Sequence, residues 1–219
     1  VVSNSSCSDD ISAEATLTVE ESPSVTADPS DATIGENSNT SFSVISDGTN
    51  LSYQWQVEQG SGFGNVSGAV YSNSTTATLS ISSAPSSMDG YEYRCVVSNS
   101  TCVDDISAEA TLTVEESPSV TADPSDVTIC ESTNTSFSVT SDGTNLSYQW
   151  QVDQGSGFGN VSGAVYSNST TTTLSISSAP SSMDGYKYRC VVSNTSCTSD
   201  ISGEAALTIE ATPTVTSNP

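Results

Sequence analysis

Polar and apolar residues alternate with a period of two along several stretches of the chain. Between positions 51 and 57 (LSYQWQV) the odd residues are apolar or aromatic and the even residues are polar. The stretches 78–81, 91–97 and 110–114 follow the same rule, with Val96 as an exception. Because successive side chains of a β-strand point to opposite faces, this pattern predicts strands with one buried and one solvated face. No stretch has the spacing of an amphipathic helix.

Residues that favour turns separate these stretches. Candidate turns lie at 28–31, 47–50, 60–62, Gly68 and 84–87, and they are rich in Gly, Pro, Asp, Asn and Ser. This spacing gives about seven short strands in about 95 residues, which is the proportion of a two-sheet β-sandwich. The sequence therefore predicts an all-β fold.

The chain repeats itself with a period of 95 residues. Residues 21–115 and 116–210 are identical at 80 of 95 positions, residues 1–20 match the end of this unit, and residues 211–219 match its beginning. Most solenoid repeats have only ~20–45 residues, so a unit of this length suits a complete domain with its own core. We expect whole domains at 21–115 and 116–210, the C-terminal strand or strands of a preceding repeat at 1–20, and the first strand of a following repeat at 211–219. Alternatively, residues 1–20 exchange a strand with the next unit.

Two motifs resemble the immunoglobulin-like domain. The stretch 53–56 (YQWQ) resembles its third strand with the core tryptophan, and 89–95 (DGYEYRC) resembles the turn and sixth strand with the tyrosine-corner residue. The resemblance implies tandem immunoglobulin-like β-sandwich domains. The expected core residues are Trp55 and Tyr93 in the first unit and Trp150 and Tyr188 in the second. Val44 and Val139 stand where the second strand of antibody domains supplies a cysteine, so the inter-sheet disulfide is expected to be absent.

A narrower resemblance comes from four phrases: YQWQV, GSGFGNVSGAVYS, MDGYEYRCVVSN and EATLTVE. With these, the units are similar to the immunoglobulin-like repeats of giant cell-surface adhesins of Bacteroidota, such as SprB-like gliding-motility adhesins. The resemblance implies an extracellular, surface-anchored filament that takes part in attachment or gliding.

The six cysteines are Cys7, Cys95, Cys102, Cys130, Cys190 and Cys197. The unit 21–115 has only Cys95 and Cys102, so full oxidation would join them across the turn between the last two strands, where facing positions approach closely enough for a disulfide. The same argument pairs Cys190 with Cys197. Cys130 has no assigned partner: it is free or competes for Cys190 or Cys197. The alternative is that all six are buried thiols. Paired positions at the repeat period favour an oxidising, extracellular setting.

Composition excludes several functions. The chain has 26 acidic and 3 basic residues, no His, and a formal net charge of −23. Nucleic acid is therefore not an expected partner, and an anionic membrane surface would repel the chain. Since no run of about 18 apolar residues exists, we expect no membrane insertion. Without His, the chain lacks the usual nucleophile-base pairs and His-ligated zinc, and we predict that it is not an enzyme. Its acidic surface would keep long filaments soluble and apart.

Acidic residues at the expected domain joints are candidate calcium ligands. In an immunoglobulin-like sandwich the loop between the last two strands lies near the linker from the preceding domain, and calcium prefers six to eight oxygen ligands. Against such a site, the chain has no D-x-D-x-D loop. No other cofactor is expected. The candidate ligands are Glu20, Glu21, Asp104 and Asp105 at one joint, and Glu115, Glu116 and Asp200 at the next.

The linkers are short, because residues 114–118 run from one expected strand almost directly into the next and Pro118 fixes a backbone dihedral. The sequence predicts a structural stalk or filament segment of a repetitive cell-surface adhesin. Its partners would be neighbouring repeats and a surface polysaccharide or other adhesive target. The alternative is a carbohydrate-binding or spacer array of a secreted enzyme. An aromatic carbohydrate platform could be formed by Phe63, Tyr71, Phe158 and Tyr166, and the other interpretation of these residues is that they pad the edge of the sandwich.

Overall fold

The computed structural model describes residues 1–211 and 213. Its regular elements are short β-strands and two 3-10 turns, η1 (Ser86–Met88) and η2 (Ser181–Met183). The strands of the first repeat are β1 (Ser24–Ala27), β2 (Ala32–Gly35), β3 (Ser38–Ser43), β4 (Ile45–Asp47), β5 (Ser52–Glu58), β6 (Phe63–Asn65), β7 (Tyr71–Ser72), β8 (Thr78–Ala84), β9 (Tyr91–Ser98), β10 (Asp105–Ile106) and β11 (Ala110–Glu115). Those of the second are β12 (Ser119–Ala122), β13 (Val127–Cys130), β14 (Thr135–Ser138), β15 (Thr140–Asp142), β16 (Ser147–Asp153), β17 (Phe158–Asn160), β18 (Tyr166–Ser167), β19 (Thr173–Ile176), β20 (Lys187–Ser193), β21 (Asp200–Ile201) and β22 (Ala205–Glu210).

Each repeat contains two principal sheets. In the first repeat, one sheet has the order β2-β11-β9-β5-β6, with β10 beside β9, and the other has the order β3-β8-β7. β2 runs parallel to β11, whereas the other pairs are antiparallel, and β1 pairs separately with β4. The second repeat has the same arrangement. The all-β sandwich predicted from the alternating pattern is confirmed.

The core of each sandwich forms around a tryptophan. Trp55 is 0% exposed, faces Cys95 across the β5–β9 pair, and donates its indole N–H to the Thr76 carbonyl oxygen at 2.9 Å. Tyr93 is also fully buried and its ring stacks on Phe42 at 4.9 Å between centroids. Trp150 and Tyr188 occupy the same places in the second core. The aromatic residues therefore join the two sheets where antibody domains use a disulfide.

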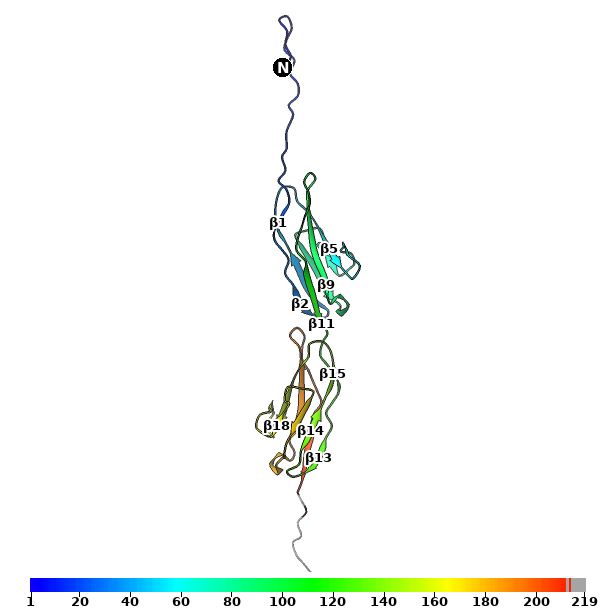
Figure 1. Cartoon of the computed structure of the whole chain (residues 1–219), viewed down its shortest axis with the longest axis vertical. Helices are drawn as coiled ribbons and strands as arrows, with labels where there is room; N and C mark the ends of the chain where they lie inside the picture. Colours follow the sequence, from blue (N-terminus) through cyan, green and yellow to red (C-terminus); the bar gives the residue numbers. More distant parts are fainter. Residues whose placement is uncertain (212, 214–219) are drawn as a thin grey trace, which may run out of the picture.

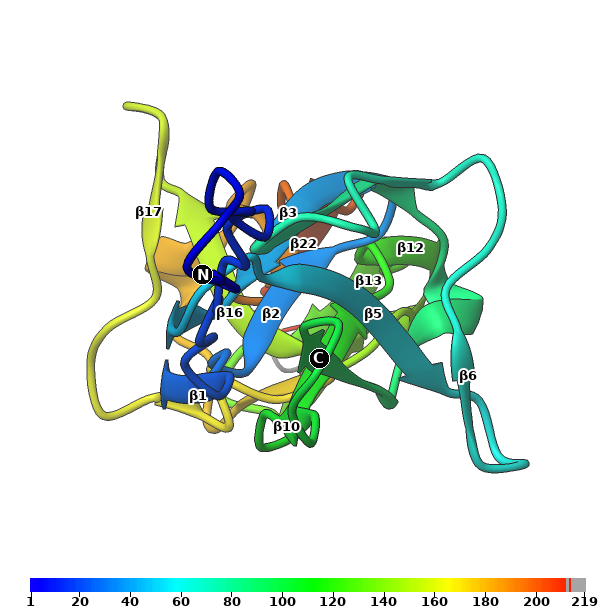
Figure 2. The same cartoon turned by 90° about the horizontal axis from the view of Figure 1, so that it is seen from above.

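The two sandwiches lie end to end along the long axis of the molecule (Figure 1). Seen along that axis, β6 of the first repeat and its counterpart β17 of the second project to opposite sides (Figure 2). Successive repeats are therefore rotated relative to one another about the axis of the rod.

The segment 1–20, expected to hold the C-terminal strand or strands of a preceding repeat, lies before the first sandwich and takes part in none of its sheets. It contains only an isolated bridge between Val2 and Asp10, and it extends away from the first sandwich (Figure 1). Its counterpart β11 is held between β2 and β9, and residues 1–20 contain no such neighbours, so the segment has no ladder to join. It also covers no edge of the first sandwich by strand exchange. The strand expected at 211–219 lies outside the described residues, apart from Ala211 and Pro213.

Candidate functional site: the joint between the repeats

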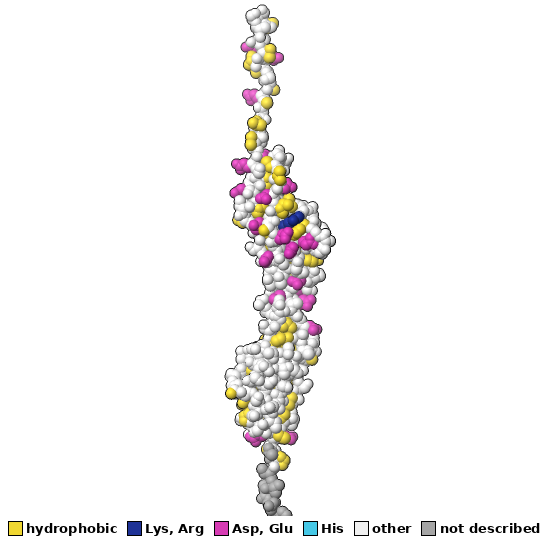
Figure 3. Space-filling model, viewed as in Figure 1, with side chains coloured by type: hydrophobic (Ala, Val, Ile, Leu, Met, Phe, Trp, Pro, Cys, Tyr) yellow, Lys and Arg dark blue, Asp and Glu magenta, His cyan; other side chains and the backbone are white. Residues whose placement is uncertain are grey.

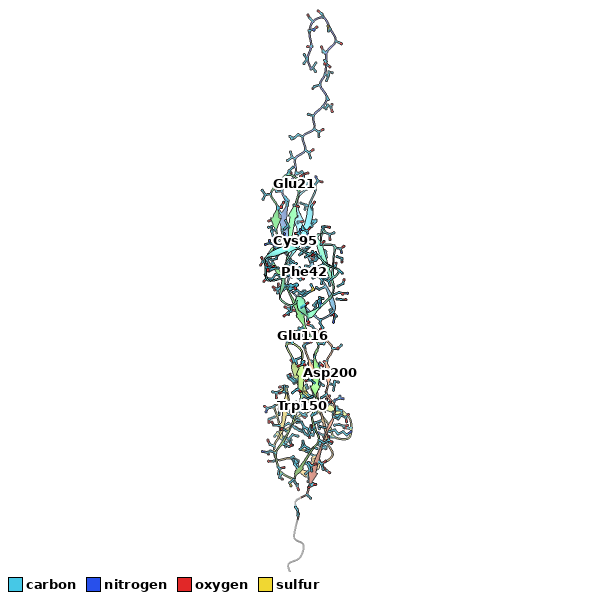
Figure 4. All side chains as sticks on the ribbon, turned by 90° about the vertical axis from the view of Figure 1, so that its right-hand side faces the viewer. Glu21, Phe42, Cys95, Glu116, Trp150 and Asp200 are labelled. Atoms are coloured by element: carbon cyan, nitrogen blue, oxygen red, sulfur yellow. The ribbon has the colours of Figure 1, made fainter. Side chains whose placement is uncertain are left out.

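The linker between the sandwiches consists of Glu116, Ser117 and Pro118, between the end of β11 and the start of β12. Figure 4 places Glu116 between the two domains. A turn of the second sandwich lies directly against this linker: a Cβ on Gly143 would come within 2.9 Å of the Ser117 carbonyl oxygen and 3.2 Å of the Pro118 Cα. Gly143 also has φ +127°, which favours glycine. The Gly143 turn therefore packs against the backbone of the linker at Ser117 and Pro118, and Pro118 is buried.

Glu115, the last residue of β11, connects the first sandwich to two loops of the second. Its side chain is buried, with the residue only 4% exposed. The carboxylate accepts hydrogen bonds from the Asn145 amide at 3.0 Å and the Thr195 hydroxyl at 3.1 Å. The backbone carbonyl oxygen of Glu115 accepts a hydrogen bond from the backbone N–H of Glu36, in the first sandwich, at 2.8 Å. The Asn145 amide is the main reason that the pKa of Glu115 lies below its usual value.

The backbone of the linker is hydrogen-bonded from both sides. The second sandwich contributes the Thr144 hydroxyl, which accepts the Glu116 N–H at 2.8 Å, and the Asn194 amide, which donates to the Glu116 carbonyl at 2.9 Å. The first sandwich contributes the Glu36 carboxylate, which accepts the Ser117 N–H at 3.1 Å. These contacts fix the linker relative to each domain.

A similar set of contacts surrounds Glu20, at the entrance to the first sandwich, although the hydroxyl with the shortest bond, Thr101, lies one place further along its loop than Thr195 does in the second repeat. Its carboxylate accepts the Asn50 amide at 2.9 Å and the Thr101 hydroxyl at 2.8 Å, and the Asn50 bond is the main cause of its lowered pKa. The Asn99 amide donates to the Glu21 carbonyl at 2.9 Å. Each sandwich therefore carries a polar socket for the glutamate that precedes it. Alternation does not reveal this socket, because its amides and hydroxyls come from loops, but the asparagines Asn50 and Asn99 recur at the repeat period as Asn145 and Asn194, and this recurrence was a usable signal.

The candidate calcium ligands do not come together. Within residues 1–211 and 213, no three Asp, Glu, Cys or His side chains form a group that could hold a metal ion. Asp105 and Asp200 accept the N–H groups of Val25 and Val120, both at 2.7 Å, within their own sandwiches. Glu20 and Glu115 are bound in the sockets described above. Three others are exposed on the surface: Glu21, Asp104 and Glu116.

The structure does not form the predicted disulfides Cys95–Cys102 and Cys190–Cys197. All six cysteines are thiols. In the β9–β10 pair Val97 faces Asp105 and Val96 faces Ile106, and Cys95 therefore lies beside Ser107, whose hydroxyl accepts its N–H at 2.9 Å. The loop between β9 and β10 is therefore longer than a Cys95–Cys102 pairing across the hairpin would require, and the residue opposite Cys95 is Ser107.

The two thiols of each predicted pair lie in different surroundings. Cys95 is fully buried in the first core, where burial raises its thiol pKa to about 11. Cys102 lies in the loop at the domain's N-terminal end, with Sγ 3.8 Å from the Glu20 carbonyl oxygen. Cys190 and Cys197 repeat these positions, and the Sγ of Cys197 lies 3.4 Å from the Glu115 carbonyl oxygen. Cys102 and Cys197 therefore belong to the joints.

The aromatic side chains considered as a carbohydrate platform are covered. The Arg94 guanidinium lies over the Phe63 ring, 3.9 Å from its centroid, and Arg189 covers Phe158 in the same way. The hydroxyl of Tyr71 is bonded to that of Tyr93 at 3.1 Å, and Tyr166 is bonded to Tyr188. These rings do not form an open stacking surface.

On the visible face of the rod, acidic side chains gather mainly on the N-terminal segment and the first sandwich, and most of the second sandwich shows no charged side chain there (Figure 3). Within the described part of the chain, the one salt bridge joins Lys187 to Glu204 at 3.0 Å, and both side chains are about half exposed. No helix in the described residues has the length and apolar character needed to cross a membrane.

No protein-family model matches the chain. Endoglucanase C of Cellulomonas fimi is 34% identical over 175 residues, which span 78% of this chain and 15% of the endoglucanase. Among solved structures, Sidekick-1 immunoglobulin domains 1 to 5 match with a TM-score of 0.66 and 18% identity, over 88% of this chain and 40% of that one. Domains 3 to 5 of Drosophila OTK match with a TM-score of 0.60 and 16% identity, over 86% and 62%.

The likeness to these structures covers 86–88% of this chain and therefore extends over both repeats. At such low identity it concerns the fold alone. The chain is a tandem array of immunoglobulin-like β-sandwich domains.

Proposed function

We propose that the chain is a stiff spacer in an extracellular repeat array, and that it serves as part of the stalk of a SprB-like cell-surface adhesin. The observation that carries this proposal is the joint at Glu115, where a buried carboxylate is bound by two loops of the following sandwich. Neighbouring repeats are the partners along the chain. The adhesive target, such as a surface polysaccharide, is bound by the complete protein.

The stiffness is tested by small-angle X-ray scattering of the chain and of two variants. Glu115→Ala removes the carboxylate from its socket. Glu210→Ala is the matched control, because Glu210 holds the same place in the second repeat and is exposed. We expect a single extended arrangement to fit the chain and the control, and a broader range of interdomain angles to be needed for Glu115→Ala. If the unsubstituted chain already requires a broad range, the stiff-spacer proposal is wrong.

A second candidate is a spacer within a secreted enzyme, and the match to endoglucanase C favours it. In that case the repeats separate a catalytic domain from another module and do not bind sugar themselves, since Arg94 and Arg189 cover the half-buried rings of Phe63 and Phe158. The neighbouring domains of the full-length gene product distinguish the two: a glycosidase domain favours the enzyme, and many further repeats favour the adhesin. Titration with cello-oligosaccharides is expected to produce no binding heat.

A further inference from the structure

Gly35 and Cys130 hold the same position in the two repeats. Gly35 ends β2 and faces Glu115 of β11 in a parallel pair, and Cys130 ends β13 and faces Glu210 of β22 in the same register. Both positions therefore lie at the end of a sandwich from which the chain enters the next repeat. The substitution of Gly by Cys is one of the 15 differences between the two units.

At the joint between the repeats, the Gly35 position lies against Cys197 of the following sandwich. A Cβ built on Gly35 would lie 2.6 Å from the Cys197 Sγ and 2.8 Å from the Ser196 carbonyl oxygen. In a disulfide, each sulfur lies about 3.0 Å from the Cβ of the other cysteine. An opening of the joint by a few tenths of an ångström would therefore bring a cysteine at this position into disulfide geometry with Cys197.

The backbone at this position accepts a side chain. Gly35 is not among the residues with positive φ, so an L-residue adopts its conformation without strain. The second repeat demonstrates this, because Cys130 occupies the same strand position. The thiol on the other side also recurs: Cys102 lies beside the Glu20 carbonyl as Cys197 lies beside that of Glu115.

We propose that Cys130 forms one half of an interdomain disulfide, whose other half is the counterpart of Cys197 in a following repeat. Residues 211–219 resemble the opening of such a repeat. The two thiols release two protons and two electrons to a low-molecular-weight disulfide such as oxidised glutathione, which is reduced to two thiols. Joints with Cys at this position are then covalently closed, whereas joints with Gly, as at Gly35, are held by hydrogen bonds and packing alone. The inference rests on the proposed repeat array and is independent of the adhesin role.

The chain itself allows the geometry to be tested with Gly35→Cys. After oxidation with glutathione disulfide and non-reducing peptide mapping, we expect the introduced thiol to be linked to Cys197, with a mass about 2 Da lower than that of the reduced chain. Alkylation of Cys197 by a maleimide should slow by at least about tenfold compared with the unsubstituted chain. Adding Cys197→Ser should abolish the link.

Two further variants separate the pairing from other effects. Gly35→Ser has nearly the size of the cysteine variant without its thiol, so it reports any steric opening of the joint. Gly64→Cys places a thiol where an added Cβ meets no atom within 4 Å, and it should remain free. The proposal is overturned if the thiol of folded Gly35→Cys is alkylated as fast as that of Gly64→Cys, or is found linked to another cysteine.

A second experiment examines Cys130 in its own joint. Residues 116–210 are duplicated directly after Glu210, so that Cys130 faces the new copy of Cys197. Peptide mapping after oxidation is expected to show this link, and Cys130→Gly should leave the copy of Cys197 free. A Cys130 that remains alkylatable, or that joins two chains into a dimer instead, would contradict the proposal. Neither result would bear on the stiffness of the joint at Glu115, which scattering measures separately.

Discussion

Glu115 is a buried carboxylate whose hydrogen-bond donors come from the neighbouring domain, so its charge matters for the joint. Folding lowers its pKa, mainly through the Asn145 amide. A carboxyl group with a lowered pKa stabilises the folded state at pH values above its usual pKa, and this stabilisation is lost as the pH falls through the folded-state pKa. The ionised form of Glu115 is therefore expected to hold the joint at neutral pH and to lose that role in acid.

The first prediction compares the chain with Glu115→Gln across pH. Gln keeps the size and one acceptor oxygen but has no charge. We expect the melting temperature of Glu115→Gln to be lower at pH 7, and the gap to close as the pH falls below the usual pKa of a glutamate and through the lowered folded-state pKa of Glu115, where the carboxylate is protonated. Glu210→Gln, whose side chain is exposed, should show no such pH-dependent gap. Calorimetry that gave the same gap at pH 3 and pH 7 would exclude a role for the charge.

The second prediction concerns Trp55, which is fully buried and whose indole N–H is bonded to the Thr76 carbonyl. Trp55→Ala leaves a large cavity and should cost about 3–5 kcal/mol of the free energy of unfolding of the first sandwich. Each sandwich contains one tryptophan, so the fluorescence of Trp150 in this variant reports the second sandwich alone. We expect its urea midpoint to remain near that of the unsubstituted chain. Loss of both domains together would show that they unfold as one unit.

At the scale of the elements, the strands could be predicted and the loops could not. Alternation has a period of two only where one face of a strand is buried, and the residues at 51–57 and 91–97 became β5 and β9 for that reason. The β9–β10 hairpin was misjudged because its loop is ordered by the Asn99 side chain, whose oxygen accepts the N–H groups of Thr101 and Cys102. These hydrogen bonds keep Cys102 in the loop and outside the β9–β10 strand pair, and they leave no trace in the alternation of polar and apolar residues.

The socket around Glu115 was missed for a related reason. The sequence placed Glu115 at a joint as a candidate calcium ligand, but its partners Asn145 and Thr195 come from two loops that are far apart in the chain. Acidic residues close together in a linker resemble a cation site when only their positions in the sequence are known and their hydrogen-bond donors are not. The hydrogen bonds that satisfy them become visible only when the loops are folded together.

The third prediction concerns the turn that packs on the linker. Gly143 has φ +127° and no room for a Cβ beside the Ser117 carbonyl, whereas Gly155 has φ +96° and open space around it. Alanine at Gly155 should cost only the strain of its backbone, about 1–3 kcal/mol. Alanine at Gly143 should cost more, because the linker must also move away. Chemical denaturation measures both costs, and an equal loss in the two variants would mean that the linker contact is unimportant.

At the scale of the whole molecule, the question is what holds the rod extended: a metal ion or the protein's own contacts. Glu115 is already bound by Asn145 and Thr195, and Asp200 by the Val120 N–H, so a cation would have to replace existing hydrogen bonds. We therefore predict that adding calcium or chelating it with EDTA changes neither the melting temperature nor the maximum dimension in scattering. Magnesium at the same ionic strength is the control, since the chain carries a net charge of −23 and any divalent cation will screen it. A shift with calcium alone, absent from a variant with Glu115→Gln and Asp200→Asn, would assign the joint to a calcium site and replace the hydrogen-bonded socket as the source of stiffness.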